Sequence, residues 1–474
     1  MRVLSITSEC APLVKTGGLA DVAGALPAAL RAVGVDMRTL LPGYPAVTAA
    51  MQDGAEVARF DDLFGAPARV IAGQAAGLDL LVIEAPHLFA RPGNPYLGPD
   101  GRDWPDNPER FAALSWVGAH LGVHGAGGWH PQVLHGHDWQ AGFVTEYLRQ
   151  MGGGPATVLT IHNIAFTGAT DAGRMHSLRL DPGRFTVDGY EFWGGISALK
   201  AGLMGADALT TVSPTYAEEL MTPEYGMGLE GVMRHRREAL TGILNGIDTH
   251  AWNPATDPAI RPFDSLEGKA ANKAVLRAEM GLPDADGPLC VIVSRMTHQK
   301  GLDLVAEALP ALLDHGGQLA LLGSGDSGLE YAFRSLGDQN PHVAVRIGYD
   351  EALSHRLIAG ADAILVPSRF EPCGLTQMYG LRYGTVPVVG LTGGLADTVI
   401  NASPAALARG VATGLQFSPV TADALRSALT RLCLLYKDTE TWSRMVANAM
   451  AHPVGWHQSA RAYATLYAGL ATQR

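Results

Sequence analysis

The sequence contains little cysteine. Its 474 residues include 4 cysteines, and Cys10, Cys290, Cys373 and Cys433 lie far apart without the spacing of metal ligands. So few thiols exclude a disulfide-stapled fold, and we expect them to be reduced. The chain runs directly into an apolar segment at residues 3–7, where a signal peptide would carry a longer hydrophobic region. These features predict a cytoplasmic protein.

The sequence also lacks a membrane-length apolar run and an excess of basic residues. No apolar stretch approaches the roughly 20 residues of a membrane span. Lys and Arg number 35 against 46 Asp and Glu, a net charge of -11, and this acidic balance disfavours a nucleic-acid partner. Any anionic substrate must therefore be met by locally placed cations. With 47% hydrophobic and 17% charged residues, the chain can fold into two or three domains.

Strand-like and helix-like segments alternate along the first half of the chain. The expected strands are residues 3–7, 35–41, 78–85, 132–137, 156–162 and 207–213. Such alternation indicates a parallel sheet with helices on both faces. Turn-forming residues then cluster between Leu244 and Pro262 and indicate a domain boundary.

A second alternating series follows this boundary, with expected strands at residues 289–294, 318–322, 342–347, 363–367 and 386–389. The sequence therefore predicts an α/β protein with two doubly wound, Rossmann-like domains, at residues 1–247 and 248–455. Residues 456–474 are expected to form an amphipathic C-terminal helix with Ala460, Ala464 and Leu466 on one face. The pattern leaves open whether this helix packs back on the first domain.

The stretch from Ser8 to Pro27 (SECAPLVKTGGLADVAGALP) joins the first expected strand to a helix. Gly17 and Gly18 are predicted at the bend, with Lys15 just before them. A helix N-terminus and a nearby lysine suit an anion, and glycines allow close approach of a ligand. An ordinary strand-to-helix loop is the alternative.

Polar residues follow two later strands of the first half. His135, His137 and Asp138 belong to HGHDWQ, and His162 belongs to TIHN. A metal site is disfavoured, because adjacent His137 and Asp138 would point to opposite faces of an extended chain. The alternative for each histidine is a structural polar residue in the core.

Cationic and acidic residues follow strands of the second half. Arg295 and Lys300 lie in SRMTHQKG and could meet a diphosphate, since Arg offers a fork and Lys a point charge. Glu371 lies in RFEPCGLTQ and could contact sugar hydroxyls or stabilise positive charge on a sugar ring. Surface charges and a helix N-cap are the alternatives. Backbone amides at residues 374–376 could hold phosphate at a second helix N-terminus.

A GxGxxG pattern at residues 323–328 (GSGDSG) imitates a dinucleotide fingerprint, with Asp350 about 20 residues on. The fingerprint belongs to the first strand-to-helix turn of a domain, and this loop follows the second expected strand. The sequence therefore disfavours NAD binding.

Taken together, long motifs resemble the bacterial glycogen synthases and plant starch synthases over nearly the whole chain. They are SECAPLVKTGGLADVAGALP, YLGPDGRDWPDNPERF, HGHDWQ, TIHN, GLEGVMRHR, GILNGID, SRMTHQKG, IGYDEALSHRLIAGADAILVPSRFEPCGLTQMYGLRYGT and TGGLADTV. The resemblance implies the GT-B fold, two Rossmann-like domains facing a cleft. It implies retaining transfer of glucose from ADP-glucose to the non-reducing end of an α-1,4-glucan, without a metal or cofactor. Gly195 departs from the family, which usually has a polar residue there.

The resemblance also implies roles for individual residues. The implied catalytic residues are Glu371, Arg295, Lys300, Asp138 and His162. The implied donor-binding residues are Lys15, Gly17, Gly18, Tyr349, Cys373, Gly374, Leu375 and Thr376. Tyr96 is implied as an acceptor contact.

The chemistry of these roles is consistent. Leaving of the diphosphate builds negative charge on phosphate and positive charge on the sugar, which preorganised cations and carboxylates stabilise. No residue is an obvious nucleophile, so front-face substitution is favoured over a covalent intermediate. A catalytically inactive glucan-binding protein and a starch synthase remain as alternatives. The choice of ADP over UDP depends on the resemblance, and the sequence does not indicate an oligomeric state.

Overall fold

The computed structural model describes residues 1–472, and the chain divides into two compact units. Unit 1 contains the residues up to Asn245 together with the segment from Trp456 onward, and unit 2 is Gly246–Gly455. Among the described residues, no helix is long and apolar enough to cross a membrane. The four cysteines are buried, and none of them forms a disulfide. The division after Asn245 falls two residues before the boundary expected from the sequence.

Unit 1 is built on a mixed sheet with the strand order β12-β11-β7-β6-β1-β2-β5-β4-β3. Its strands are β1 (Arg2–Ile6), β2 (Asp36–Pro42), β3 (Gln52–Phe60), β4 (Ala68–Ala75), β5 (Leu78–Glu84), β6 (Val133–His137), β7 (Ala156–Ile161), β11 (Ala208–Thr211) and β12 (Leu240–Gly242). The pairs from β12 to β5 are parallel, whereas β3 and β4 form an antiparallel edge. This edge escaped the sequence analysis because β3 is largely exposed and shows no apolar run.

Short strands β8 (Ala169–Thr170), β9 (Glu191–Phe192) and β10 (Gly195–Ser197) form a separate small sheet in unit 1. The helices of unit 1 are α1 (Gly18–Arg31), α2 (Pro45–Ala50), α3 (Pro86–Phe89), α4 (Asn107–His124), α5 (Val144–Gln150), α6 (Ala198–Gly205), α7 (Pro214–Glu219), α8 (Glu230–His235) and α18 (His457–Ala471).

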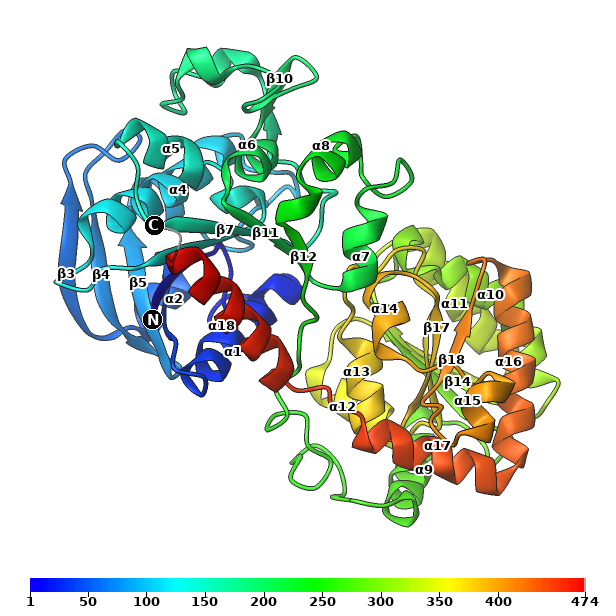
Figure 1. The fold of residues 1–474 in the computed structure, drawn as a ribbon. Coiled ribbons are helices and arrows are strands. Elements are labelled where there is room, and N and C mark those ends of the chain that lie inside the picture. The colour runs from blue at the N-terminus through cyan, green and yellow to red at the C-terminus, as the bar shows by residue number, and fades with distance from the viewer. Residues whose placement is uncertain (473–474) are drawn as a thin grey trace. The chain divides into compact units, whose positions relative to one another are not determined.

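The C-terminal helix α18 packs against α1 of unit 1 (Figure 1). Its buried face is formed by Ser459, Ala460, Tyr463 and Tyr467, and the last three of these side chains join a core cluster with residues of β1, α1 and β6. Ala464 and Leu466, which the sequence analysis placed with Ala460, are only half-buried. The face is therefore turned toward the two tyrosines, whose larger side chains remove more apolar surface from water.

Unit 2 is built on a parallel sheet with the strand order β15-β14-β13-β16-β17-β18. Its strands are β13 (Leu289–Val293), β14 (Gln318–Gly323), β15 (Val343–Ile347), β16 (Ala363–Val366), β17 (Val386–Gly390) and β18 (Leu415–Phe417). Its helices are α9 (Leu266–Met280), α10 (Leu302–Leu313), α11 (Ser327–Gln339), α12 (Glu351–Gly360), α13 (Thr376–Arg382), α14 (Gly393–Thr398), α15 (Pro404–Ala408), α16 (Ala422–Lys437) and α17 (Thr439–Ala451).

Among the parallel strands of each unit, the strand order reverses at one point. In unit 1 the reversal lies between β1 and β6, and in unit 2 it lies between β13 and β16. Open α/β sheets bind ligands outside the carboxyl ends of the strands at such points. The segments that follow these four strands are therefore the first places to search for a functional site.

Candidate functional site

The loop after β1 leads into α1, which begins at Gly18 with Gly17 as its N-cap. Gly17 has an extended backbone with φ of -154°, and neither glycine has a left-handed conformation. A Cβ atom on either residue would meet open space. The turn itself therefore does not require glycine, and the two residues leave the surface beside the loop uncovered.

Lys15 precedes these glycines and pairs with an acid on the first turn of α1. Its Nζ donates to Asp21 Oδ1 at 2.8 Å, and the lysine side chain is 44% exposed. An exposed pair of this kind is worth little in stability. The ammonium can therefore exchange its carboxylate partner for an anionic ligand at small cost.

Glu9 organises the same loop and was missed by the sequence analysis. Its buried carboxylate accepts from the Thr16 backbone N–H, from Thr16 Oγ1 at 2.6 Å and from the Gly17 N–H at 3.3 Å. The Tyr96 hydroxyl also donates to Glu9 Oε1 at 2.5 Å. The only sequence signal was an acidic residue between two buried stretches. Glu9 fixes the backbone just after Lys15, because a buried carboxylate requires all its donors.

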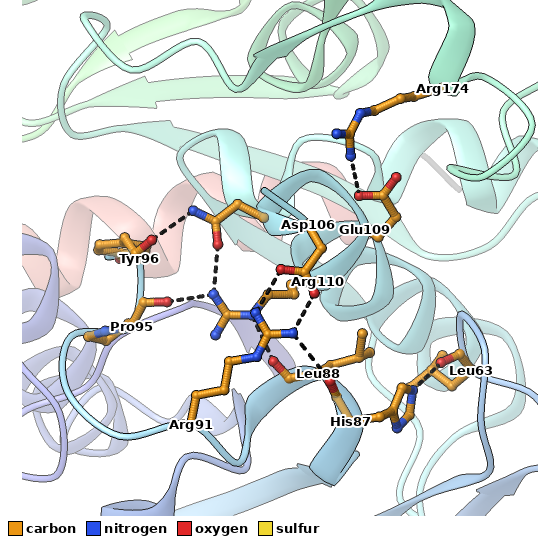
Figure 2. Close-up of polar contacts among 11 residues, drawn as sticks. Leu63, His87, Leu88, Arg91, Pro95, Tyr96, Asp106, Glu109, Arg110 and Arg174 are labelled. Carbon is orange, nitrogen blue, oxygen red and sulfur yellow. Dashed lines mark hydrogen bonds and ion pairs between the residues drawn. The ribbon is translucent and has the colours of Figure 1, made fainter. Parts of the chain in front are cut away.

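The segment that carries Tyr96 is held in place by Arg110, which is fully buried on α4 (Figure 2). Arg110 donates to the carbonyl of Leu88 at 2.7 Å, to that of Pro95 at 2.8 Å and to Asn107 Oδ1 at 2.7 Å. Asn107 in turn donates to the Tyr96 carbonyl at 2.9 Å. This network aims the Tyr96 hydroxyl at Glu9, and burial raises the pKa of Tyr96 well above its usual value.

Asp138 lies directly after β6 with a left-handed φ of 53°. Its Oδ1 accepts from the backbone N–H of His162 at 2.7 Å and from that of Asn163 at 3.4 Å. Burial raises the pKa of Asp138 to about 7, although the two N–H donors oppose this shift. A strained, buried carboxyl that titrates near neutral pH at a strand end is a functional-site candidate.

His162, after β7, belongs to a group of three neighbouring histidines with His135 and His137. Its Nε2 lies 3.0 Å from Nδ1 of His137, and the His135 and His137 ring centroids are 4.2 Å apart. Burial lowers the pKa of His137 to about 3 and that of His162 well below its usual value. Within residues 1–472, no group of three or more His, Cys, Asp or Glu could hold a metal ion. Because burial lowers the pKa of both rings, His137 and His162 are neutral near pH 7 and act as hydrogen-bonding groups.

In unit 2, two sequence-predicted residues meet directly. Lys300, in a 3₁₀ turn after β13 (His298–Lys300), has its Nζ 2.5 Å from Glu371 Oε2. Ser368 Oγ also donates to this oxygen at 2.8 Å, and Glu371 is 7% exposed. These residues line a cavity of about 50 Å³ together with Gly374, Leu375, Thr376 and Gln377. The opposite charges of Glu371 and Lys300 compensate each other, which offsets the cost of removing both groups from water.

The loop between Glu371 and α13 is shaped by Gln377, a second residue that the sequence analysis missed. Its Nε2 donates to the carbonyls of Cys373 and Gly374, each at 3.0 Å. Gly374 has a φ of 71°, and a Cβ there would lie 2.6 Å from Gln377 Oε1. Only glycine fits this position, so Gln377 and Gly374 together define the path of the loop.

Two predicted residues lie apart from this cavity. Arg295 is exposed, and its side chain has no hydrogen-bond or ion-pair partner among residues 1–472. Tyr349 is 80% exposed, and its hydroxyl donates to Glu351. Both side chains are accessible to a ligand of unit 2.

The GSGDSG loop has a packing explanation. A Cβ on Gly323 would lie 2.1 Å from the Ser294 carbonyl oxygen, and one on Gly325 would lie 2.4 Å from that of Met296. Asp326 caps α11 through the N–H groups of Gly328 and Leu329. The glycines therefore serve the close approach of two loops.

Comparison with known proteins decides the family. A family model described as starch synthase catalytic domain matches residues 2–235, and one described as glycosyl transferases group 1 matches residues 278–451. A glycogen synthase from Jannaschia sp. (strain CCS1) is 64% identical over 98% of both chains. One from Paracoccus denitrificans (strain Pd 1222) is 62% identical over 99% of both. The chain belongs to the glycogen synthase family.

Solved structures agree with this family. The catalytic domain of starch synthase IV from Arabidopsis thaliana, bound to ADP and acarbose, matches with a TM-score of 0.86 and 33% identity over 99% of both chains. The sucrose-phosphate synthase of Thermosynechococcus elongatus matches in fold, with a TM-score of 0.61 and 19% identity over 100% of both chains. The predicted family and the predicted GT-B fold class are thereby confirmed.

Proposed function

We propose that this chain is a retaining glucosyltransferase that moves glucose from ADP-glucose to the non-reducing end of an α-1,4-glucan. The observation that carries this proposal is the Lys300–Glu371 pair in a cavity bordered by residues 374–376. This arrangement offers a cation, a carboxylate and backbone N–H groups at the strand reversal of unit 2. Membership of the glycogen synthase family supplies the substrate class.

In unit 2, the proposed task is to stabilise the charges that develop as the sugar–phosphate bond breaks. Lys300 and the exposed Arg295 would neutralise the departing diphosphate, and amides of Gly374, Leu375 and Thr376 would donate to its oxygens. Glu371 would accept from sugar hydroxyls or stabilise positive charge on the ring. Groups fixed before the reaction stabilise such charges without reorganisation, and Glu371 is already fixed by Lys300 and Ser368.

In unit 1, the proposed tasks are to hold anionic donor groups and the transferred glucose. Lys15 would bind a donor phosphate after leaving Asp21, beside the open surface at Gly17 and Gly18. Asp138 and His162 would contact the glucose.

We propose front-face substitution, in which the leaving phosphate oxygen accepts the proton of the incoming hydroxyl. A covalent route needs a carboxylate that attacks the far face of the sugar, and no residue of the sequence is an obvious nucleophile. Mass spectrometry of enzyme quenched during turnover should therefore find no glucosyl adduct. An adduct on Asp138 or Glu371 would contradict this mechanism.

The test of the function is transfer of radiolabelled glucose to glycogen from ADP-glucose and from UDP-glucose. We expect incorporation from ADP-glucose at a rate at least tenfold higher. Binding of glycogen without incorporation from either donor would instead indicate an inactive glucan-binding protein.

A further inference from the structure

Ser5, His137 and His162 form a linear hydrogen-bonded relay in unit 1. Ser5 Oγ on β1 lies 3.1 Å from Nε2 of His137 on β6. Nδ1 of His137 lies 3.0 Å from Nε2 of His162, which follows β7. Ser5 and His137 are almost completely buried. The relay therefore connects a buried serine on β1 to His162, at the carboxyl end of β7.

Both rings of the relay are neutral near pH 7, because burial lowers the pKa of each. A neutral imidazole donates from one nitrogen and accepts at the other. Only two proton arrangements can then satisfy both ring–ring and ring–serine contacts. In the first, Ser5 donates to His137, and His137 Nδ1–H donates to His162 Nε2. In the second, every donor is reversed.

The serine hydroxyl distinguishes the two arrangements. Among the described residues, the His137 ring is the hydrogen-bond partner that the structure gives to Ser5 Oγ. In the reversed arrangement Ser5 would accept, and its own O–H would be buried without an acceptor. An unsatisfied buried donor costs about 1–3 kcal/mol, so the arrangement in which Ser5 donates predominates.

The remaining nitrogen of His162 is available to a ligand. Nδ1 of His162 has no hydrogen-bond partner among residues 1–472. It is also not one of the fully buried side-chain atoms that lack a partner in that range. His162 itself is partly exposed. When Nε2 accepts from His137, this open Nδ1 must carry the proton.

We propose that Ser5 and His137 are positioning residues that fix His162 as the Nδ1–H tautomer. His162 then presents an N–H donor at the edge where Asp138 presents a carboxylate. One donor and one acceptor side by side match the hydroxyl groups of a sugar. The consequence for catalysis rests on the proposed function, in which His162 contacts the transferred glucose. The tautomer of His162 does not depend on that function.

The experiment is long-range ¹H–¹⁵N NMR of the full chain labelled with ¹⁵N-histidine, because nitrogen shifts separate protonated from bare ring nitrogens. His137→Gln and His162→Gln variants assign the signals. We expect a protonated Nδ1 and a bare Nε2 for His162 in the wild type. An Nε2–H tautomer would overturn the proposal, whatever the activity of the enzyme.

Ser5→Ala removes the donor that selects the arrangement. We expect mixed tautomers of His162 and a three- to tenfold lower kcat, with both KM values changed less than twofold. Ser5→Thr keeps a hydroxyl and should restore the wild-type tautomer and rate. A pure Nδ1–H signal in Ser5→Ala would show that Ser5 does not select the tautomer.

Tyr467→Phe is the matched control. The Tyr467 hydroxyl on α18 lies 2.7 Å from His135 Nδ1, so this variant removes one buried hydroxyl beside a neighbouring histidine outside the relay. It should leave the tautomer of His162 and kcat unchanged. If Tyr467→Phe changes the tautomer of His162 as much as Ser5→Ala does, the effect is a general loosening of the core and the proposal fails.

A wild type that shows the Nδ1–H tautomer yet transfers no glucose would refute only the proposed function.

Discussion

The two units hold their strand-end polar residues in opposite ways. In unit 1, Asp138, His137 and His162 lie in a largely buried hydrogen-bonded network, and burial shifts the pKa of each toward its uncharged form. In unit 2, Lys300 and Glu371 form an ion pair at 2.5 Å. Desolvation is therefore the main influence on the groups of unit 1. In unit 2, the opposite charges of Lys300 and Glu371 compensate each other.

This difference matches two kinds of chemistry. Neutral donors and acceptors are suited to orienting uncharged sugar hydroxyls, because they bind through direction more than through charge. A compensated ion pair is suited to an anion that gains charge during the reaction, since the cation is already in place. Variants that remove one member of each set should therefore fail in different ways.

The largest expected effect comes from Glu371→Gln, which removes the negative charge and keeps the shape. We expect kcat to fall about a thousandfold, about 4 kcal/mol, because the carboxylate no longer stabilises positive charge on the sugar and no longer fixes Lys300. Steady-state assays of glucose incorporation measure this change.

Asp362→Asn is the matched control for this variant. Asp362 pairs with Lys273 at 2.6 Å in the same unit, with both side chains similarly buried. Its loss should lower the thermal stability of unit 2 and change kcat less than twofold. Turnover near normal in Glu371→Gln, or an equal loss in Asp362→Asn, would remove the charge-compensation argument from the mechanism.

Asp138→Asn tests the desolvation argument through stability. The folded-state pKa of Asp138 is raised from 3.8 to about 7, so the stability that this group provides is complete below pH 4 and lost as the pH rises through 7. Asn keeps the Oδ1 acceptor and never ionises. The stability advantage of Asp138→Asn over the wild type should therefore grow by about 2 kcal/mol between pH 5.5 and 8.5.

Calorimetry at the two pH values measures this difference for unit 1. Asp171→Asn, at an exposed carboxylate of the same unit, controls for the loss of one charge. A stability advantage of Asp138→Asn that does not grow with pH would show that burial does not govern this carboxyl.

Much of the fold could be predicted from the sequence, because buried parallel strands are continuous apolar runs. The run at residues 289–294 matches β13 within one residue, and the run at 78–85 matches β5 equally well. β3 was missed since most of its residues are exposed. β18 was missed because its three residues form no recognisable run.

The site could be predicted only as far as motifs reach. Motifs marked the strand ends, but the contact between Lys300 and Glu371 was not predicted, because it depends on β13 and β16 being neighbours in the sheet. Motifs did not reveal that Glu9 supports the Lys15 loop or that Gln377 shapes the loop at Gly374. Their roles depend on burial and on hydrogen-bond geometry, which spacing along the chain does not encode.

Lys15→Ala tests the cation that unit 1 carries in the loop after β1. We expect the KM for ADP-glucose to rise about ten- to thirtyfold, about 1.4–2 kcal/mol, with kcat changed much less, because the ammonium binds a phosphate in ground and transition states alike. Arg31→Ala, which removes an exposed cation paired with Asp79 at the other end of α1, should leave KM unchanged. An unchanged donor KM in Lys15→Ala would mean that unit 1 binds its ligand without this charge.

The smallest expected effect comes from Tyr96→Phe, which sharpens the comparison within unit 1. The sequence analysis implied an acceptor contact for Tyr96, whereas its hydroxyl donates to Glu9, which holds Thr16 and Gly17. Loss of that donor should loosen the Lys15 loop and raise the donor KM about threefold, about 0.7 kcal/mol, with the KM for glycogen unchanged. Tyr190→Phe, which removes a hydroxyl bonded to the Asp181 carbonyl at 2.7 Å, should change neither KM. If Tyr96→Phe instead raises the KM for glycogen alone, the hydroxyl contacts the glucan, and Glu9 supports the loop without it.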